Sequence, residues 1–335
     1  MSEKIDILLL DEKSIEAQLK IHRAAFGAEG VSITKEYWIK KHYQNPLGNS
    51  LIFGASIDGN IVGMNAYMPM EYEYRGEKHK FLQSCESGVL PECQGRGIWG
   101  KVVRYALKYI ADYTNYEAVI GFPNYITSYP GFNKMGWLTT NDMENYLMVN
   151  NVNSFAKIFS ARNTLIKILS RGIFIQRLFL IGKSNLTIEP CEAEETIWDE
   201  RPEIACRSHT PELLNWKKSY LGTDTICIKK NNVIVASCIY HLDKYNDIPI
   251  IKLERIATNG NVSYKKAFVA LLKYFKKNYP EVAFVRLWAT QDSSIRPVIK
   301  QLMFMKSGHR NPFIISNSNS ILYDKKWDLS FYDLD

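Results

Sequence analysis

The chain has 335 residues, more than one ordinary hydrophobic core supports, so two domains of about 150 residues each are expected. Its 46% hydrophobic and 23% charged residues exclude an intrinsically disordered chain, and no apolar run reaches the ~18 residues of a membrane-spanning helix. The net charge of +7 suits a polyanion such as a phosphorylated cofactor or a membrane surface, but no nucleic-acid-binding motif accompanies it, so we expect no nucleic-acid partner.

The cysteines and the N-terminal segment indicate a cytoplasmic protein. The six cysteines form no CxxC pair and have no histidine partners at metal-binding spacing. They are therefore predicted to be reduced thiols rather than disulfides or zinc ligands, and no metal site is expected. Acidic residues flank the short apolar run near the N-terminus, which does not fit a secretory signal.

Strand and helix signals alternate over the first 150 residues. Apolar residues at helical spacing predict helices over 15–26 and 34–43, and Asp58-Gly59 predicts a tight turn between two strands. The order β-α-α-β-β-β-α-β-α-β predicts an α/β fold with a mixed sheet (α+β). The other expected elements are strands over 5–10, 51–57, 61–67, 81–90 and 117–122, helices over 97–113 and 125–135, and closing strands around 137 and 146–149.

The same order of signals recurs in the second half of the chain. An aromatic-rich helix, a strand and a tight turn occur at 38–62 and again at 216–235. The phrase Phe-x-Lys-x-Gly at 132–136 is echoed at 304–308. Several echoes in the same order predict a divergent internal duplication. The two predicted units span 1–150 and 191–335.

Residues 151–190 join these units and differ from them in composition. From Asn145 to Ile188 the chain has no acidic residue, while six Lys and Arg residues alternate with apolar side chains. One interpretation is a helical connector that packs its apolar side on both domains. The other is a basic amphipathic segment, 153–183, that lies on an anionic membrane surface. In either case we predict mainly helical structure between Ser154 and Leu180.

The stretch from Val89 to Lys101 lies between an expected strand and an expected long helix, and it contains three glycines. Glycines let the backbone turn tightly and direct successive N–H groups outward, and a helix start adds about half a positive charge. Such a combination favours an anion site suited to a pyrophosphate, although a plain strand–helix turn has glycines too.

Residues 94–97, Gln-Gly-Arg-Gly, resemble the (Arg/Gln)-x-x-Gly-x-(Gly/Ala) loop of the GNAT superfamily of N-acetyltransferases, and Val89 and Pro91 supply its usual Val-x-Pro phrase. Asn124 and Gly136-Trp137 are similar to its Asn…Gly-aromatic element. The expected order of elements is also that of this superfamily. The resemblance implies a GNAT-like, acyl-CoA-binding domain over 1–150, with acetyl-CoA as co-substrate. A narrower similarity, to GNAT proteins found with bacterial polysaccharide genes, rests on 121–124 and 327–329.

The resemblance also implies roles for individual residues. The backbones of Val89 and Leu90 would pair with the pantetheine arm and polarise the thioester carbonyl. Glu86, on the preceding strand, is the best-placed carboxylate to accept a proton from the attacking amine, unless it is a salt-bridged strand residue. The implied cofactor-binding residues are Val89, Leu90, Gln94, Gly95, Arg96, Gly97, Ile98, Trp99, Gly100, Asn124 and Phe132.

Two positions depart from the family pattern. Trp99 stands where the loop usually has Gly or Ala, so a bulky side chain must find room beside the pyrophosphate. Phe132 stands where a tyrosine often serves as general acid, and a phenyl ring cannot protonate a thiolate. A thiolate with a reference pKa of ~8.5 is a tolerable leaving group, so catalysis need not be lost. Tyr129 is a candidate substitute acid or, alternatively, a packing aromatic.

The second half lacks the glycine loop. Residues 256–261 contain a single glycine and no basic residue at the corresponding place. The second unit is therefore expected to be a degenerate GNAT-like domain that walls the acceptor pocket and does not bind the cofactor. The candidates for that pocket are Glu254, Arg255, Arg286 and Trp288.

The leading hypothesis is an acyl-CoA-dependent N-acyltransferase. It would move an acetyl group from acetyl-CoA directly, without a covalent intermediate, to a primary amine of a small molecule such as an amino sugar. A second hypothesis is a Fem-like aminoacyl or peptidyl transferase. It follows from the tandem architecture, which is similar to that of Fem-type aminoacyl transferases and N-myristoyltransferases, whose donors are aminoacyl-tRNA or a longer acyl-CoA. A third is a non-catalytic module that binds acyl-CoA or a sugar, and the missing tyrosine keeps it open.

Overall fold

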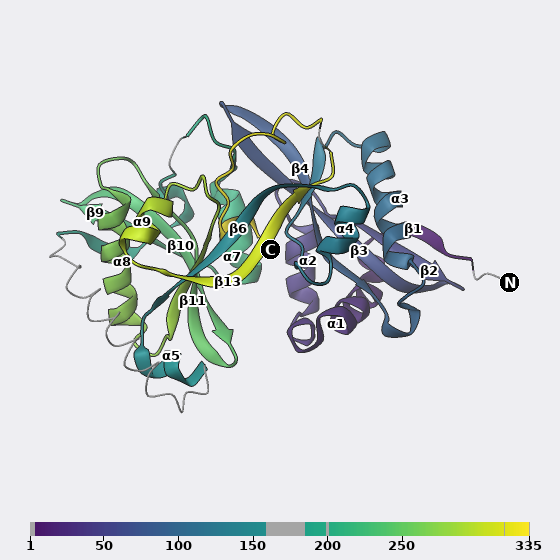
Figure 1. Cartoon of the computed structure of the whole chain (residues 1–335), viewed down its shortest axis with the longest axis horizontal. Helices are drawn as coiled ribbons and strands as arrows, with labels where there is room; N and C mark the ends of the chain where they lie inside the picture. Colours follow the sequence, from purple (N-terminus) through teal and green to yellow (C-terminus); the bar gives the residue numbers. More distant parts are fainter. Residues whose placement is uncertain (1–3, 159–184, 199–200, 318, 335) are drawn as a thin grey trace. The chain divides into compact units, whose positions relative to one another are not determined.

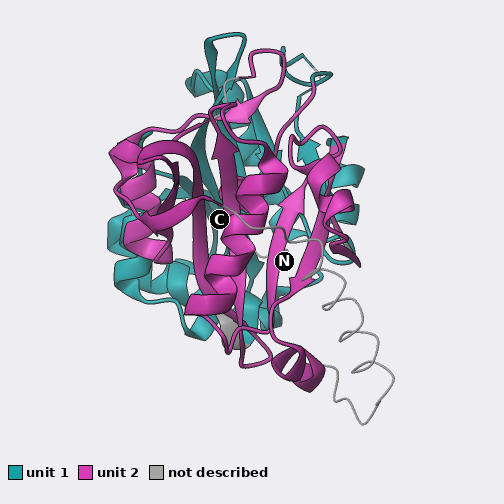
Figure 2. Ribbon diagram, turned by 90° about the vertical axis from the view of Figure 1, so that its left-hand side faces the viewer, with its two compact units in different colours: residues 1–140, 312–325 teal, residues 141–311, 326–335 magenta. Residues whose placement is uncertain are grey.

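The computed structural model describes residues 4–158, 185–198, 201–317 and 319–334 (Figure 1). The chain divides into two compact units (Figure 2), unit 1 with residues 1–140 and 312–325 and unit 2 with residues 141–311 and 326–335. It passes between the units three times: within β6 (Leu138–Val149), within β13 (Met305–Ile315), and between Lys325 and Lys326. Each unit is thus completed by a segment from the other half of the sequence.

Unit 1 is a mixed sheet with four helices in its described residues. The strand order is β1-β2-β3-β4-β5, followed by the end of β13. Neighbours from β1 to β4 are antiparallel, β4 and β5 are parallel, and β5 and β13 are antiparallel. The strands are β1 (Asp6–Leu10), β2 (Leu51–Ile57), β3 (Asn60–Tyr74), β4 (Glu77–Val89) and β5 (Ala118–Gly121), and the helices are α1 (Ile15–Val31), α2 (Lys35–Tyr43), α3 (Ile98–Tyr113) and α4 (Tyr129–Lys134).

The helices of unit 1 follow from local sequence signals. Helix α2 begins after Thr34, whose side chain accepts a hydrogen bond from the N–H of Tyr37. Helix α3 is amphipathic, and its apolar face lies in the core of unit 1. Burying each large apolar side chain stabilises the unit by about 1.5–3 kcal/mol. The buried residues of α3 are Ile98, Val102, Val103, Ala106 and Ile110.

Unit 2 repeats this plan. Its strand order is β6-β12-β11-β10-β9-β7, in which β11 and β12 are parallel and the other neighbours antiparallel. A Thr-capped helix, a three-stranded meander, a long helix, a parallel strand and a short helix follow one another as in unit 1. The elements are α5 (Val152–Ile158), β7 (Thr187–Pro190), β8 (Cys206–Arg207), α7 (Pro211–Leu221), β9 (Asp224–Lys230), β10 (Val233–Tyr245), β11 (Ile248–Thr258), α8 (Tyr264–Asn278), β12 (Phe284–Ala289) and α9 (Arg296–Gln301). The predicted mixed α/β class is confirmed.

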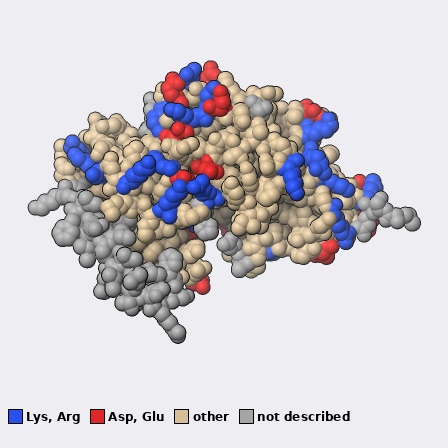
Figure 3. Space-filling view, in the orientation of Figure 1, with Lys and Arg blue, Asp and Glu red and all other residues tan. Residues whose placement is uncertain are grey.

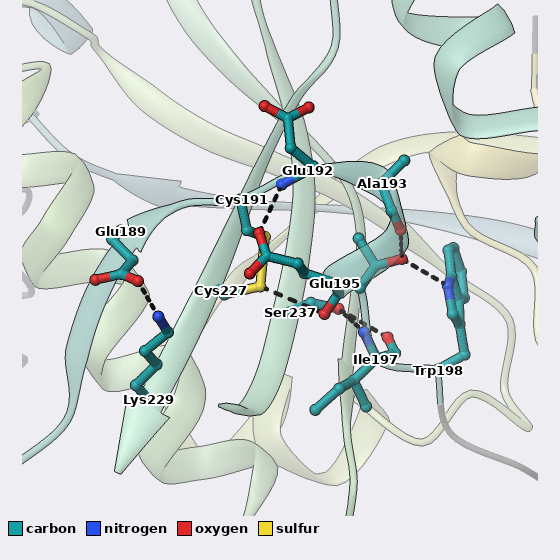
Figure 4. Close-up of a disulfide and its surroundings, with 11 residues drawn as sticks. Glu189, Cys191, Glu192, Ala193, Glu195, Ile197, Trp198, Cys227, Lys229 and Ser237 are labelled. Atoms are coloured by element: carbon teal, nitrogen blue, oxygen red, sulfur yellow. Dashed lines mark hydrogen bonds and ion pairs between the residues drawn. A yellow bond between two sulfur atoms is a disulfide. The ribbon is translucent and has the colours of Figure 1, made fainter. Parts of the chain in front are cut away.

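Two of the cysteines are joined, so the prediction of reduced thiols is wrong for them. Cys191 and Cys227 form a disulfide in unit 2 (Figure 4), with their Cα atoms 5.7 Å apart. The pairing of β7 with β9 sets Glu189 opposite Cys227. Cys191 follows Glu189 by two residues and therefore lies close to Cys227. The two residues are 36 positions apart in sequence, so spacing alone did not reveal the pair. The free cysteines are Cys85, Cys93, Cys206 and Cys238.

We expect the disulfide to contribute to the stability of unit 2. The double variant Cys191→Ser/Cys227→Ser should lose about 2–4 kcal/mol of unfolding free energy, because the crosslink closes a long loop in the unfolded chain. Urea unfolding with and without reductant measures this. Reductant should lower the stability of the parent and leave the double variant unchanged; equal sensitivity of both proteins would contradict the assignment.

The connector lies largely outside the described residues. Helix α5 covers 152–158, the first part of the segment predicted to be helical, and the description resumes at 185. Among the helices that the structure describes, none is long and apolar enough to cross a membrane. On the face drawn in Figure 3, Lys and Arg are more prominent than Asp and Glu, in keeping with the net charge of +7.

Candidate functional site

Strand β4 extends beyond the end of its neighbour β5. Their parallel register runs from Phe81 opposite Ala118 to Ser84 opposite Gly121, so residues 85–89 extend beyond β5. On its other edge β4 stays paired with β3 as far as Val89. Among the described residues, the last residues of β4 therefore have no strand partner on the β5 side.

A β-bulge lies where β4 leaves β5. Met64 pairs with Gly88 and Ala66 with Cys85, so the single residue Asn65 faces two residues of β4. One of these two is Glu86, whose φ of 38° places it in the left-handed region.

The glycine loop and the start of α3 lie beside the last residues of β4. Gly95 and Gly97 adopt φ angles of 77° and 70°, which favour glycine, and a Cβ at either position would meet nothing within 4 Å. Gly97 caps α3 without a side-chain hydrogen bond, so the first N–H groups of the helix have no capping side chain. The Nε2 group of Gln94 donates to the carbonyl oxygen of Val89 at 3.1 Å and ties the loop to β4.

These elements line an open pocket of about 390 Å³ in unit 1. Seven of the predicted cofactor-binding residues line it: Val89, Gln94, Gly95, Gly97, Ile98, Trp99 and Gly100. Sequence reasoning missed the other five lining residues, which are Ser87, Gly88, Cys93, Thr127 and Ser128. The pocket combines a helix N-terminus with a strand edge, which suits a ligand with an anionic group and an amide-bearing arm.

Four predicted cofactor-binding residues lie outside this lining. The N–H of Leu90 donates to Val62 at 2.8 Å and its carbonyl accepts from Cys93 at 2.9 Å, so the protein itself uses both backbone groups. The guanidinium of Arg96 donates to the carbonyl of Glu92 at 3.3 Å. The remaining two residues, Asn124 and Phe132, contact residues that line the pocket.

Asn124 shapes the loop that supplies the far wall of the pocket. Its side-chain oxygen accepts hydrogen bonds from the N–H groups of Ile126 at 2.9 Å and Thr127 at 3.3 Å. The N–H of Asn124 donates to the hydroxyl of Ser128 at 3.0 Å. Since Thr127 and Ser128 line the pocket, Asn124 positions the wall rather than forming it.

The bulky Trp99 side chain is accommodated against α4. Its ring lies so close to Gly131 that a Cβ there would be 2.6 Å from it. The ring also packs edge-on against Phe132, with centroids 4.9 Å apart. Gly131 therefore makes the room that the tryptophan needs, and Phe132 is a buried packing residue between Trp99 and Trp137.

The hydroxyl of Tyr129 makes a hydrogen bond within the protein. It is hydrogen-bonded to Oγ1 of Thr139 at 2.9 Å, and the ring lies near that of Tyr125, with centroids 5.0 Å apart. Tyr129 does not line the pocket. The geometry therefore favours the packing interpretation of Tyr129 over that of a general acid.

Glu86 is buried in an ion pair. Its carboxylate contacts the ammonium of Lys41, and its second oxygen lies 3.6 Å from Nε2 of His42. Burial alone would raise the pKa of Glu86, but Lys41 and His42 outweigh it and lower the pKa to about 2. The ligand atoms of His42, Cys85 and Glu86 lie within 4.8 Å of one another, yet the ammonium of Lys41 on the same carboxylate disfavours a metal cation there.

The comparisons with known proteins agree with this geometry. Residues 6–139 match the model of a family described as acetyltransferase (GNAT) domain. The chain carries a GNAT domain. This domain contains β1 to β5, α1 to α4 and the whole pocket, and its fold is that of acyl-CoA-dependent acyltransferases. No curated protein matches the sequence.

Solved structures extend the likeness from the GNAT domain to both units. A GCN5-related N-acetyltransferase from Anabaena variabilis has a TM-score of 0.61 at 11% identity, over 93% of this chain and 72% of that one. A conserved protein from Enterococcus faecalis, described as a probable N-acyltransferase, has 0.64 at 11%, over 93% and 72%. Saccharomyces cerevisiae N-myristoyltransferase with bound myristoyl-CoA has 0.63 at 8%, over 94% and 78%. At these identities the likeness concerns the fold.

Unit 2 differs from the GNAT domain at the corresponding helix start. Helix α8 is capped by Ser263, whose side chain accepts from the N–H of Lys266, so the helix satisfies one of its own N–H groups. Three of the predicted acceptor-pocket residues, Glu254, Arg255 and Trp288, line a void of only about 10 Å³. Their role in an acceptor pocket stays a prediction.

Proposed function

We propose that the chain is an N-acyltransferase that moves an acetyl group from acetyl-CoA to a primary amine of a small molecule, such as an amino sugar. The observation that carries the proposal is the uncapped start of α3 beside the free edge of β4, with a pocket of about 390 Å³ between them. The GNAT domain supplies the class of reaction.

The pocket suggests how acyl-CoA lies in unit 1. The pyrophosphate fits the N-terminus of α3, where the Gly95–Gly97 backbone leaves room and the helix dipole favours negative charge. The pantetheine amides then run along the open edge of β4. Since the N–H of Leu90 faces β3, alternation along the strand directs that of Val89 to the open side. That group is suited to hydrogen-bond the pantetheine arm or the thioester carbonyl.

The chemistry is direct aminolysis of the thioester. The neutral amine attacks the carbonyl carbon, a C–N bond forms, and the C–S bond breaks to release the CoA thiolate. A hydrogen-bond donor at the carbonyl oxygen would stabilise the charge that develops there. The thiolate is a tolerable leaving group without a tyrosine acid, which suits the packed Phe132 and the engaged Tyr129.

An assay separates this proposal from its alternatives. Purified protein is screened with acetyl-CoA against amino sugars, amino acids and peptides, with free thiol release as the readout, and in parallel with longer acyl-CoAs. Acetyl transfer to a small amine supports the proposal. Turnover only with long acyl chains or aminoacyl-tRNA would favour the transferases of the second hypothesis, and acetyl-CoA binding without turnover would favour a non-catalytic module.

We also propose that the protein touches anionic lipid through residues 153–183. The acid-free, basic composition of this segment supports the proposal. Flotation with anionic vesicles but not with neutral ones is expected. Equal flotation with both kinds of vesicle, or none with either, would contradict it.

A further inference from the structure

Lys41 and Glu86 join a helix of unit 1 to the bulge of β4. Lys41 lies near the end of α2, and its side chain is 1% exposed, while that of Glu86 is 9% exposed. The carboxylate stands on the bulged stretch where β4 leaves β5. The pair therefore fixes α2 to the residue from which the pocket-lining part of β4 starts.

Unit 2 contains the same arrangement. Lys217 of α7 contacts Glu254 of β11 at 3.0 Å, with side chains 1% and 2% exposed. Glu254 also stands on a bulge, because the pairing of β11 with β10 shifts by one residue between Ile239 and Tyr240. A histidine again contacts the carboxylate, here Nδ1 of His241 at 3.0 Å.

The helix caps show that the two lysines occupy equivalent positions. Thr34 and Thr210 are the N-caps of α2 and α7, and each side chain accepts a hydrogen bond from the N–H three residues later. Lys41 follows Thr34 by seven residues, and Lys217 follows Thr210 by seven. Both Lys–Glu pairs thus join the same place on the helix to the same place on the sheet.

From this repetition we infer that Lys41 and Glu86 are positioning residues that clamp α2 to the bulge of β4, and that Glu86 is not the proton acceptor of the reaction. The inference rests on the proposed function. Unit 2 keeps the pair although its long helix is capped by Ser263 and the space beside Glu254 is only about 10 Å³. Because the pair recurs beside a capped helix start and a small void, it serves the architecture of the repeat.

The electrostatics agree with a clamp. A pKa of about 2 means that Glu86 stays ionised at neutral pH and is a weak base. The pKa of Glu254 is lowered to about 2 as well, by Lys217 and His241 against the effect of burial. A buried pair of this kind loses most when one partner alone is removed, because the other charge then stays buried without compensation.

Removing one or both charges distinguishes a clamp from a base. Glu86→Gln alone should lower the melting temperature by roughly 10 °C and reduce acyl transfer. Lys41→Met/Glu86→Gln, which removes both charges and keeps the volumes similar, should regain most of the melting temperature. It should also regain kcat to within about tenfold of the parent, with the parent's pH profile.

If Glu86 is the proton acceptor, the double variant will be folded but roughly 10²–10⁴-fold slower, and its pH profile will change. That result would overturn the inference, and so would a double variant no more stable than Glu86→Gln. The corresponding variants of unit 2 are Glu254→Gln and Lys217→Met/Glu254→Gln. The double variant should regain less stability there than in unit 1, because Nζ of Lys217 also donates to the carbonyls of Tyr332 at 2.8 Å and Leu334 at 3.0 Å. A parent that neither binds nor uses acetyl-CoA would refute the proposed function instead, and the stability comparison would still test the clamp.

Discussion

Gly97→Glu is expected to abolish acetyl-CoA binding, with a loss of at least about 100-fold in affinity. Gly97 has a φ of 70° and caps α3, and the space in front of it is open. A glutamate there places bulk and a negative charge where the pyrophosphate should lie, and two like charges about 4 Å apart repel by several kcal/mol in a partly desolvated site. Isothermal titration with acetyl-CoA measures the change.

Gly260→Glu in unit 2 is the matched control for this experiment. Gly260 also has a positive φ, 85°, in the loop before the long helix of its unit, and a Cβ there would meet nothing within 4 Å. Both substitutions therefore introduce similar backbone strain, about 1 kcal/mol. Gly260→Glu should bind acetyl-CoA like the parent. Folded Gly97→Glu protein with parental affinity would show that the cofactor lies elsewhere.

Acid is expected to unfold the protein between about pH 4.3 and pH 2. The pKa values of Glu86 and Glu254 are lowered to about 2 in the folded chain, whereas an unfolded glutamate titrates near pH ~4.3. A lowered folded-state pKa gives stability that is present above the unfolded value and is lost as pH falls through the folded value. Each carboxylate should account for roughly 3 kcal/mol of this loss.

Urea unfolding at pH 3, 4, 5 and 6 tests this dependence. In Lys41→Met/Glu86→Gln and in Lys217→Met/Glu254→Gln, the free energy of unfolding should fall less steeply with decreasing pH. The difference from the parent should equal the contribution of one carboxylate in each case. Asp112→Asn should leave the pH dependence unchanged, because Asp112 pairs with Lys108 on an exposed part of α3. A pH dependence as steep in the double variants as in the parent would contradict the assignment of the two buried pairs.

The parts of the site that sequence could predict are those with local signals. The loop glycines and Gln94 stand beside a strand and before an amphipathic helix, and each of these features is read within a few residues. The mixed sheet and its repetition follow in the same way, from turns such as Asp58-Gly59 and from the recurring order of helices and strands.

The parts that sequence could not predict depend on contacts between distant residues. When the two repeats are aligned on Trp38 and Trp216, Lys41 and Lys217 do not coincide. They coincide when the helices are aligned on their Thr N-caps, which the structure identifies. The Cys191–Cys227 bond depends on the pairing of β7 with β9. The order of helices and strands along the chain does not reveal that β6 and β13 each belong partly to one unit and partly to the other.

We expect unit 1 alone to hold the acyl-CoA. The most direct test is the stoichiometry of acetyl-CoA binding to the intact chain, by calorimetry and native mass spectrometry. We expect one acetyl-CoA per chain, because no side chain caps the start of α3, whereas Ser263 caps that of α8. Two molecules bound per chain with similar affinity, or none, would contradict it.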